Sequence, residues 1–221
     1  MFRLMINCFL CLIIALLTGC KTEAEIPVRF SDFNAKSTHK IQGKLIVEIP
    51  ACKDYNSDMP SDSLFKIKQK LPYVFNGAKF ENCFEKNFSS YALFSFPVSI
   101  VKSKTNLNMT QDTINISFDK NKSGFKSLSV FIPDKLRSSI NKMIKSEIFI
   151  KKSDLKITLA LDPEGKKGSF QILGGYLNNK PVQFGIFNNN GEKFKVTIPS
   201  YGIDLLLSGD YKYIAMYNAK F

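Results

Sequence analysis

The chain has 221 residues, 44% of them hydrophobic, which is enough to bury a substantial core in one or two domains. Its formal net charge of +12 would normally suggest a nucleic-acid or anionic-membrane partner. Only three of the 31 basic residues are arginine, whereas base and phosphate recognition favours the planar arginine fork. We therefore expect a solvated, lysine-rich surface and no nucleic-acid partner.

The first segment of the chain is built like a secretory signal. One basic residue, Arg3, precedes an almost wholly apolar run over residues 4–17, which is too short to span a bilayer. The run ends in Leu17-Thr18-Gly19-Cys20, where small residues precede a boundary. This pattern predicts a signal peptide over residues 1–19 that is removed from the mature protein.

The tetrapeptide at residues 17–20 resembles the lipobox of bacterial lipoproteins, which are cleaved just before the cysteine and diacylated on its sulfur. The resemblance implies that Cys20 is the lipidated first residue of the mature chain and that its acyl chains anchor the protein to a membrane. Position 21 is lysine; an aspartate there favours the inner membrane in that family, so Lys21 implies the outer membrane. The alternative is an ordinary signal peptide whose apolar segment contains Cys20.

Two further cysteines, Cys52 and Cys83, remain in the mature chain. In an oxidising periplasm they most simply pair, and a bridge over this separation would contribute about 3–4 kcal/mol on chain-entropy reasoning. Two buried free thiols are the alternative. Because His39 is the only histidine and a third thiolate is lacking, we expect no metal site and no cofactor.

Short runs that alternate apolar and polar residues dominate the remaining sequence and predict β-strands. In chain order these runs cover residues 25–30, 44–50, 91–101, 113–118, 128–132, 147–151, 155–161, 169–173, 182–187, 194–198 and 211–217. Pro27 suggests an edge position for the first, and Pro97 is expected to break or bulge the third. The last four are expected to form a meander with turns at residues 174–175, 188–191 and 208–210.

Two segments have helical spacing. Residues 61–71 begin with Ser61 or Asp62 as N-cap and are expected to end before Pro72. Residues 133–145 place apolar side chains on one face and basic ones on the other. At this length such a helix more often covers a sheet than lies on a membrane. The whole pattern predicts a mainly β (α+β) fold: an antiparallel β-sandwich or partly open barrel with one or two short covering helices.

The sequence also predicts how the chain is divided. Residues 20–40 are polar at intervals, and we expect them to form the acylated anchor and a tether. Residues 41–221 then form one β-rich globular body. A boundary near Ser146 is the alternative, because the mature cysteines and both predicted helices precede it.

Three sequence patterns touch on known chemistry. Ser63-Leu64-Phe65-Lys66 matches the Ser-x-x-Lys of serine acyl-enzymes, but this pattern recurs throughout a Ser- and Lys-rich chain. Asp119–Gly124 reproduces the first half of an EF-hand loop, but position twelve is Val130 where a glutamate is required. His39 lies in a polar stretch and is interpreted as a surface residue. We predict no catalytic residue and a non-enzymatic protein.

Beyond the anchor, the sequence contains no motif that assigns a biochemical activity. A Lys/Asn-rich lipoprotein with a β-rich body and a segment such as residues 173–182 is similar to uncharacterised lipoproteins of prophages and mobile elements. That resemblance implies an accessory envelope protein, for instance one that blocks an outer-membrane receptor against a second phage or plasmid. The alternative is a carrier or chaperone for a lipid, peptide or outer-membrane client, with the Phe-rich runs Phe80–Phe88 and Tyr91–Phe96 lining an apolar groove. A hydrolase ranks last.

Overall fold

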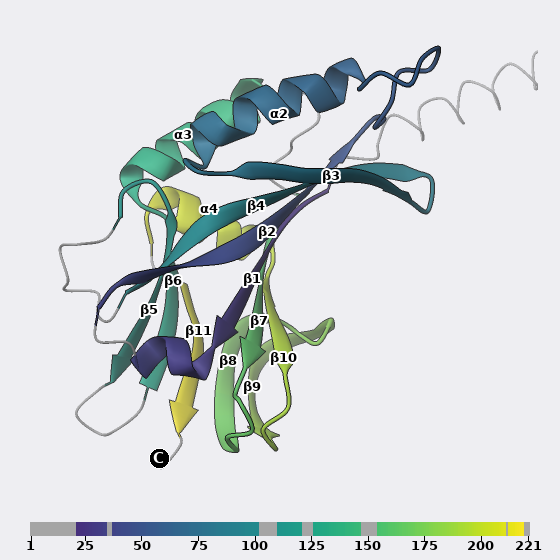
Figure 1. Ribbon diagram of the computed structural model, residues 1–221. Helices are drawn as coiled ribbons and strands as arrows, with labels where there is room; N and C mark the ends of the chain where they lie inside the picture. Colours follow the sequence, from purple (N-terminus) through teal and green to yellow (C-terminus); the bar gives the residue numbers. More distant parts are fainter. Residues whose placement is uncertain are drawn as a thin grey trace, which may run out of the picture.

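A computed structural model describes residues 21–34, 37–101, 110–120, 126–146, 154–210 and 212–218. Within these residues, eleven strands form one strongly curled sheet (Figure 1). The strands are β1 (Thr22–Arg29), β2 (His39–Ile49), β3 (Lys79–Lys86), β4 (Ser89–Val101), β5 (Ile114–Lys120), β6 (Lys126–Phe131), β7 (Leu155–Asp162), β8 (Gly168–Leu177), β9 (Lys180–Asn189), β10 (Phe194–Ile198) and β11 (Lys212–Asn218). The helices are the 3₁₀-helix η1 (Phe30–Asn34), α2 (Asp62–Val74), α3 (Asp134–Ser146) and α4 (Ser200–Ser208).

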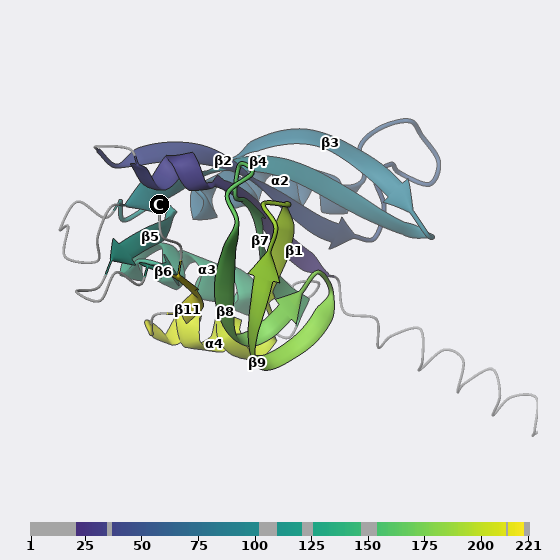
Figure 2. The same ribbon diagram turned by 90° about the horizontal axis from the view of Figure 1, so that it is seen from below.

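The sheet curls until its strand path returns on itself. Neighbouring strands run in the order β10-β7-β1-β2-β4-β5-β6-β11-β8-β9, and β10 also pairs with β8 at Val196–Leu177 and Thr197–Tyr176. Strand β9 continues beyond β8, and β3 branches off β4. Seen from below, the strands surround the interior of the body (Figure 2). The predicted β-dominant α+β fold is therefore confirmed, with a mixed sheet, because β1–β7 and β4–β5 pair in parallel.

The core lies inside the curl. The alternation of side chains along each strand places the apolar residues there. In β1, Ala24, Ile26 and Val28 point inward and are buried, whereas Glu23 and Glu25 between them point outward. Helices α2, α3 and α4 gather toward the upper end of the sheet in Figure 1, whereas η1 follows the lower end of β1. Their buried residues are Leu64, Ile67 and Leu71 of α2, Leu136, Ile140 and Met143 of α3, and Ile203, Leu206 and Leu207 of α4. The covering role expected for residues 61–71 and 133–145 agrees with this packing.

The first strand corrects the predicted division of the chain. Residues 22–29 pair with β7 and residues 22–25 also pair with β2, so this stretch belongs to the body and not to a tether reaching residue 40. The strand expected over residues 25–30 begins earlier, at Thr22, and buried Ala24 continues its alternation. The alternative boundary near Ser146 is also wrong, because β1–β7 and β6–β11 join segments from either side of it in one sheet.

Three prolines that were expected at an edge, a break or a helix end lie inside regular elements: Pro27 in β1, Pro97 in β4 and Pro72 in α2. Strand β1 is central, yet Pro27 lies beyond the residues that pair with β2, where β1 is bonded to β7. Strand β4 runs unbroken through Pro97, which falls between the part paired with β3 and the part paired with β5. Helix α2 continues past Pro72 to Val74. The backbone N–H of Phe75 donates to the Leu71 carbonyl at 2.9 Å, and both side chains are buried, which holds this last turn in place.

The last third of the chain is not a simple meander. Gly174 and Gly175 lie inside β8, and the turn to β9 is made by Asn178 and Asn179, both with positive φ. A Cβ at Gly175 would lie 2.7 Å from the Thr197 carbonyl, so the bend in β8 requires glycine there. In the described residues β9 pairs with β8, whereas β10 leaves to pair with β7, so the expected β9–β10 hairpin is wrong.

Two elements of the structure, helix α4 and strand β3, have no counterpart among the predicted segments. Helix α4 was not predicted, and Gly209 is its left-handed C-cap where a hairpin turn was expected. Strand β3 forms a hairpin with β4 through the turn at Asn87-Phe88. The strand expected over residues 147–151 lies outside the described residues.

Candidate functional site

Two of the three predicted site residues lie within the described part of the chain. Cys20 lies outside the described residues, immediately before Lys21. Cys52 and Cys83 form the predicted disulfide, with their Cα atoms 5.8 Å apart. The bridge fastens the loop that follows β2 to strand β3. It lies apart from the polar groups described next and has a structural role.

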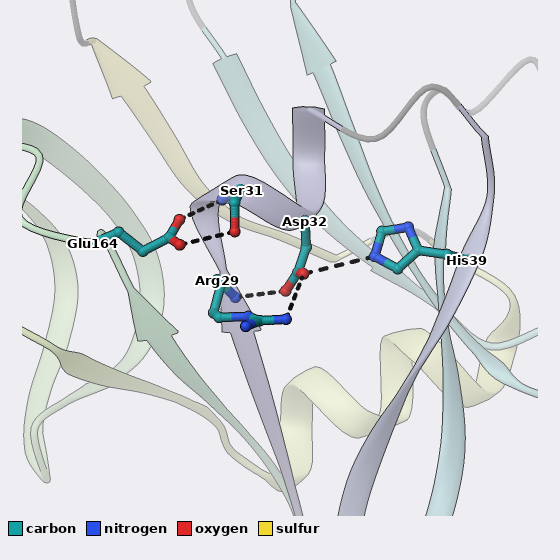
Figure 3. Close-up of polar contacts among 5 residues, drawn as sticks. All are labelled: Arg29, Ser31, Asp32, His39 and Glu164. Atoms are coloured by element: carbon teal, nitrogen blue, oxygen red, sulfur yellow. Dashed lines mark hydrogen bonds and ion pairs between the residues drawn. The ribbon is translucent and has the colours of Figure 1, made fainter.

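His39 is not in a tether but begins strand β2, where it faces a buried carboxylate (Figure 3). Its Nε2 lies 3.7 Å from Oδ1 of Asp32, whose side chain is only 7% exposed. The backbone N–H of Arg29 donates to Oδ2 of Asp32 at 2.8 Å, and the Arg29 guanidinium lies 3.6 Å from Oδ1. Sequence reasoning missed Asp32, because its burial and its contacts depend on the fold and no local pattern singles it out.

Figure 3 shows a polar cluster of Arg29, Ser31, Asp32, His39 and Glu164, in which Ser31 points away from His39 and toward Glu164. Its hydroxyl donates to Oε1 of Glu164 at 2.9 Å, and its backbone N–H donates to Oε2 at 2.6 Å. A nucleophilic serine needs its hydroxyl directed at the base, so these residues do not form a Ser-His-Asp triad. The contacts instead fasten η1 to the turn that follows β7.

Next to this cluster a groove opens on the outer face of β1, β7 and β10, with a volume of about 570 Å³. We call it the rim groove and define it by the residues that line it: Pro27, Val28, Arg29, Ala160, Leu161, Asp162, Asn178, Asn179, Lys193, Phe194 and Lys195. Strands form its floor and the β8–β9 turn forms one wall. Asn178 fixes that wall, because its N–H donates to the Lys195 carbonyl at 2.9 Å and its Oδ1 accepts from the Lys195 N–H at 2.8 Å.

The rim groove carries charges of both signs on ordered strands. Lys193 Nζ lies 3.0 Å from Oδ2 of Asp162, and Lys195 Nζ donates to Glu25 at 3.1 Å. Arg29 adds a third cation. The backbone N–H of Glu164, which donates to Asp162 at 2.9 Å, together with Lys193 and Arg29, holds the pKa of the Asp162 carboxyl below its usual value.

This pKa shift predicts a specific acid sensitivity. Because the folded-state pKa of Asp162 is lowered, its charge stabilises the fold above the unfolded pKa, and that contribution disappears as the pH falls through the folded value. Asp162→Asn should reduce the free energy of unfolding at neutral pH by about 0.2–1 kcal/mol, the range of exposed ion pairs. Denaturant titrations at neutral and strongly acidic pH check this; a gap between wild type and variant that persists in acid would contradict it.

A second hollow of about 320 Å³ continues from the rim groove and shares Asn179 with it. It is lined by Glu23, Lys156, Tyr176, Asn179 and Thr197. A hydrogen-bonded row crosses its floor: Thr158 donates to Glu23 at 2.8 Å and contacts the Thr197 hydroxyl at 2.9 Å. The two hollows together offer charged groups, hydrogen-bond donors and acceptors, and apolar contacts, a combination found in preformed ligand sites.

The described residues contain no group of three or more His, Cys, Asp or Glu side chains placed to hold a metal ion. The EF-hand-like stretch is only partly described; its first residue, Asp119, lies near the end of β5, while Val130 is fully buried in the core. The rim groove is a preformed surface, because paired strands hold most of its lining residues.

Taken together, the fold and this surface define a class: a curled mixed β-sheet body, covered at one end by helices, that carries on its outer face a groove lined by charged and apolar side chains. The chain belongs to the family described as a domain of unknown function, DUF7424, whose model matches residues 22–221. Searches of curated proteins and of solved structures found no match to this chain.

Proposed function

We propose that this protein is a lipid-anchored protein of the bacterial envelope, held on the outer membrane through Cys20, that binds a segment of another envelope protein in the rim groove. The observation that carries the binding role is the groove itself: about 570 Å³, lined by charged and apolar side chains, and floored by three paired strands. Rigid strands hold the lining residues in place before any ligand arrives, so little ordering cost remains for binding.

Two observations support the anchor. The lipobox-like tetrapeptide ends at Cys20, and both the family match and the first strand begin at residue 22. The folded body thus starts directly after the proposed lipidation site. No helix in the described part of the chain is long and apolar enough to cross a membrane.

The groove lining favours a protein segment as the ligand. Arg29, Lys193 and Lys195 can pair with acidic side chains, while Asn179 and Asp162 offer amide and carboxylate groups to a polypeptide backbone. Tyr176, 39% exposed in the neighbouring hollow, offers an aromatic contact. Blocking an outer-membrane receptor by holding one of its loops is the accessory role this surface fits best.

The carrier alternative has less support. Phe94 and Phe96, from one of the Phe-rich runs, are fully buried in the core, and Phe84 stacks on Tyr91 with ring centroids 5.5 Å apart. An apolar cavity lies between the sheet and helices α3 and α4, with Ile140, Met143 and Ile203 among its lining, but its volume is only about 50 Å³. That space is far below the several hundred Å³ of a typical ligand pocket.

The proposal is tested by crosslinking in cells followed by affinity purification of four proteins: wild type, Cys20→Ser, Ala160→Arg and Gln42→Arg. Ala160 points outward from the groove floor, so arginine there fills the groove without entering the core. Gln42 is an exposed outward position on β2 outside the groove and serves as the matched control.

One dominant envelope protein should be recovered with wild type and with Gln42→Arg, and at least tenfold less of it with Ala160→Arg, the loss that about 1.4 kcal/mol of binding energy produces. Cys20→Ser should leave the membrane fraction and lose the partner as well. Equal capture by Ala160→Arg and Gln42→Arg would overturn the groove as the binding site. A co-purifying lipid with no protein partner would favour the carrier.

A further inference from the structure

The folded body leaves almost no chain between itself and Cys20. The backbone N–H of Glu48 donates to the Lys21 carbonyl at 2.8 Å, and the Lys21 N–H donates to the Glu48 carboxylate at 3.0 Å. Strand β1 begins at the next residue, Thr22. Two residues span at most about 7 Å, so acyl chains on Cys20 would hold this end of the sheet at the membrane surface. The inference that follows rests on the proposed lipid anchor.

Three large apolar side chains protrude at the same end. Phe88 is fully exposed in the β3–β4 turn, and Tyr55 and Met59 are 99% and 67% exposed in the loop that follows β2. The strand pairing fixes the position of Phe88: Glu48 of β2 lies opposite Tyr91 of β4, and the β3–β4 turn extends beyond that level. Figures 1 and 2 show this loop and this turn projecting where β1 begins.

The disulfide keeps these two segments together. Cys52 begins the loop and Cys83 lies in β3, so the bridge holds the loop against the hairpin that carries Phe88. The Lys53–Pro60 bridge and the ion pair between Lys53 and Asp58 at 2.7 Å order the loop further. The apolar side chains are thus presented from an ordered support.

Phe88 is also unexplained by folding. It has φ +64°, a left-handed conformation that a bulky residue rarely adopts, and its ring gains no burial in the body. Asparagine or glycine would make the same turn with less strain. A ligand for the ring outside the protein accounts for its presence.

We propose that Tyr55, Met59 and Phe88 form a membrane-facing end, which inserts into the headgroup region of the same bilayer that holds the acyl chains of Cys20. Aromatic rings are the side chains best suited to that depth. The charges of this end, Lys53 and Lys86 against Asp54, Asp58 and Glu85, nearly balance, so binding depends on apolar contact and not on anionic lipid. The second contact fixes the orientation of the body. Arg29 lines the rim groove and lies seven residues along β1 from Thr22, a strand length of about 23 Å. With the body in this orientation, the rim groove is held at about that distance from the membrane.

The chain contains no tryptophan, so a single introduced tryptophan reports its own surroundings. The lipidated full-length mature protein, with acylation verified by mass spectrometry, is reconstituted into phosphatidylcholine vesicles as Phe88→Trp, Tyr55→Trp and Tyr73→Trp. Tyr73 is the matched control: it is 87% exposed but lies near the far end of α2, about 16 Å along the helix from Asp62.

Phe88→Trp and Tyr55→Trp should emit at shorter wavelength with vesicles than in detergent-free buffer, and brominated lipid should quench roughly half of their emission, as for rings about 5–10 Å into the headgroup–acyl boundary. Adding salt or anionic lipid should leave the quenching unchanged. Tyr73→Trp should show neither effect.

Three outcomes would contradict this proposal. The membrane-facing end would be overturned, and the anchor left intact, if the acylated Phe88→Trp and Tyr55→Trp proteins showed the same emission as Tyr73→Trp. Protein without acyl groups would overturn both proposals. A blue shift without vesicles would indicate contact between two copies and would also overturn the lipid assignment.

Discussion

Replacing both Cys52 and Cys83 with serine should lower the free energy of unfolding by about 3–4 kcal/mol. The bridge closes a sequence separation of 31 residues, which includes all of α2, and its removal gives the unfolded chain back the freedom of that loop. Both cysteines are only half-buried, so serine introduces little packing defect of its own. Urea unfolding of the wild type and the double variant, each monitored by circular dichroism, measures the difference.

Reduction of the wild-type protein provides the control, because it opens the same bridge without changing the side chains. The reduced wild type and the double variant should unfold at the same urea concentration. A loss below about 1 kcal/mol would mean that the segment between the cysteines is already restricted in the unfolded state. In that case the bridge serves only to position the loop carrying Tyr55 and Met59.

Local chemistry in the sequence predicted local structure well. The N-cap of α2 is Ser61, whose Oγ accepts from the Leu64 N–H at 3.1 Å, as the cap pattern indicated. Helix α3 covers the predicted segment and buries its apolar face. The strands likewise follow the alternation of apolar residues, since burying one face of a sheet demands that pattern. These features depend on residues two to four positions apart, which the sequence displays directly.

The arrangement of those elements was harder to predict because it depends on distant partners. Asn-Gly at residues 190–191 favours a hairpin, yet β10 pairs with β7 instead. The turn residue Gly191 is used to approach Gly165 closely, where a Cβ would lie 2.5 Å from the carbonyl oxygen. Pro27 indicates an edge, yet β1 gains β7 as a parallel neighbour from more than a hundred residues later. Such pairings have no local signature.

The candidate site shows the same limit. The rim groove combines the end of β1, the end of β7, the β8–β9 turn and the start of β10, four segments that meet only after the sheet has curled. The sequence indicates no more than a turn at Asp162, and no pattern singles out Asp32. The polar neighbours of His39 suggest a tether, although His39 and Lys40 begin strand β2. By contrast, the predicted anchor at Cys20 depends on one contiguous motif, so it needs no knowledge of the fold.

The closure of the sheet beside the rim groove depends on one buried ring. Phe170 of β8 lies within reach of three other rings, with centroid distances of 5.8 Å to Phe30, 5.2 Å to Phe187 and 4.7 Å to Phe194. It therefore joins η1, β8, β9 and β10 in one cluster. Phe170→Ala should lower the free energy of unfolding by about 3–5 kcal/mol through lost burial and the cavity left behind. Urea unfolding measures this change.

Phe184→Ala is the matched control, because Phe184 lies on the neighbouring strand β9 but is 64% exposed. Its loss should change the free energy of unfolding by no more than about 0.5 kcal/mol. Phe170 contacts Phe194, which also lines the rim groove. At temperatures where both variants remain folded, Phe170→Ala should therefore capture less of the partner than Phe184→Ala does. Equal stability of the two variants would show that the ring cluster does not hold β8 and β10 together. The wall formed by Asn178 would then depend mainly on its two backbone contacts with Lys195.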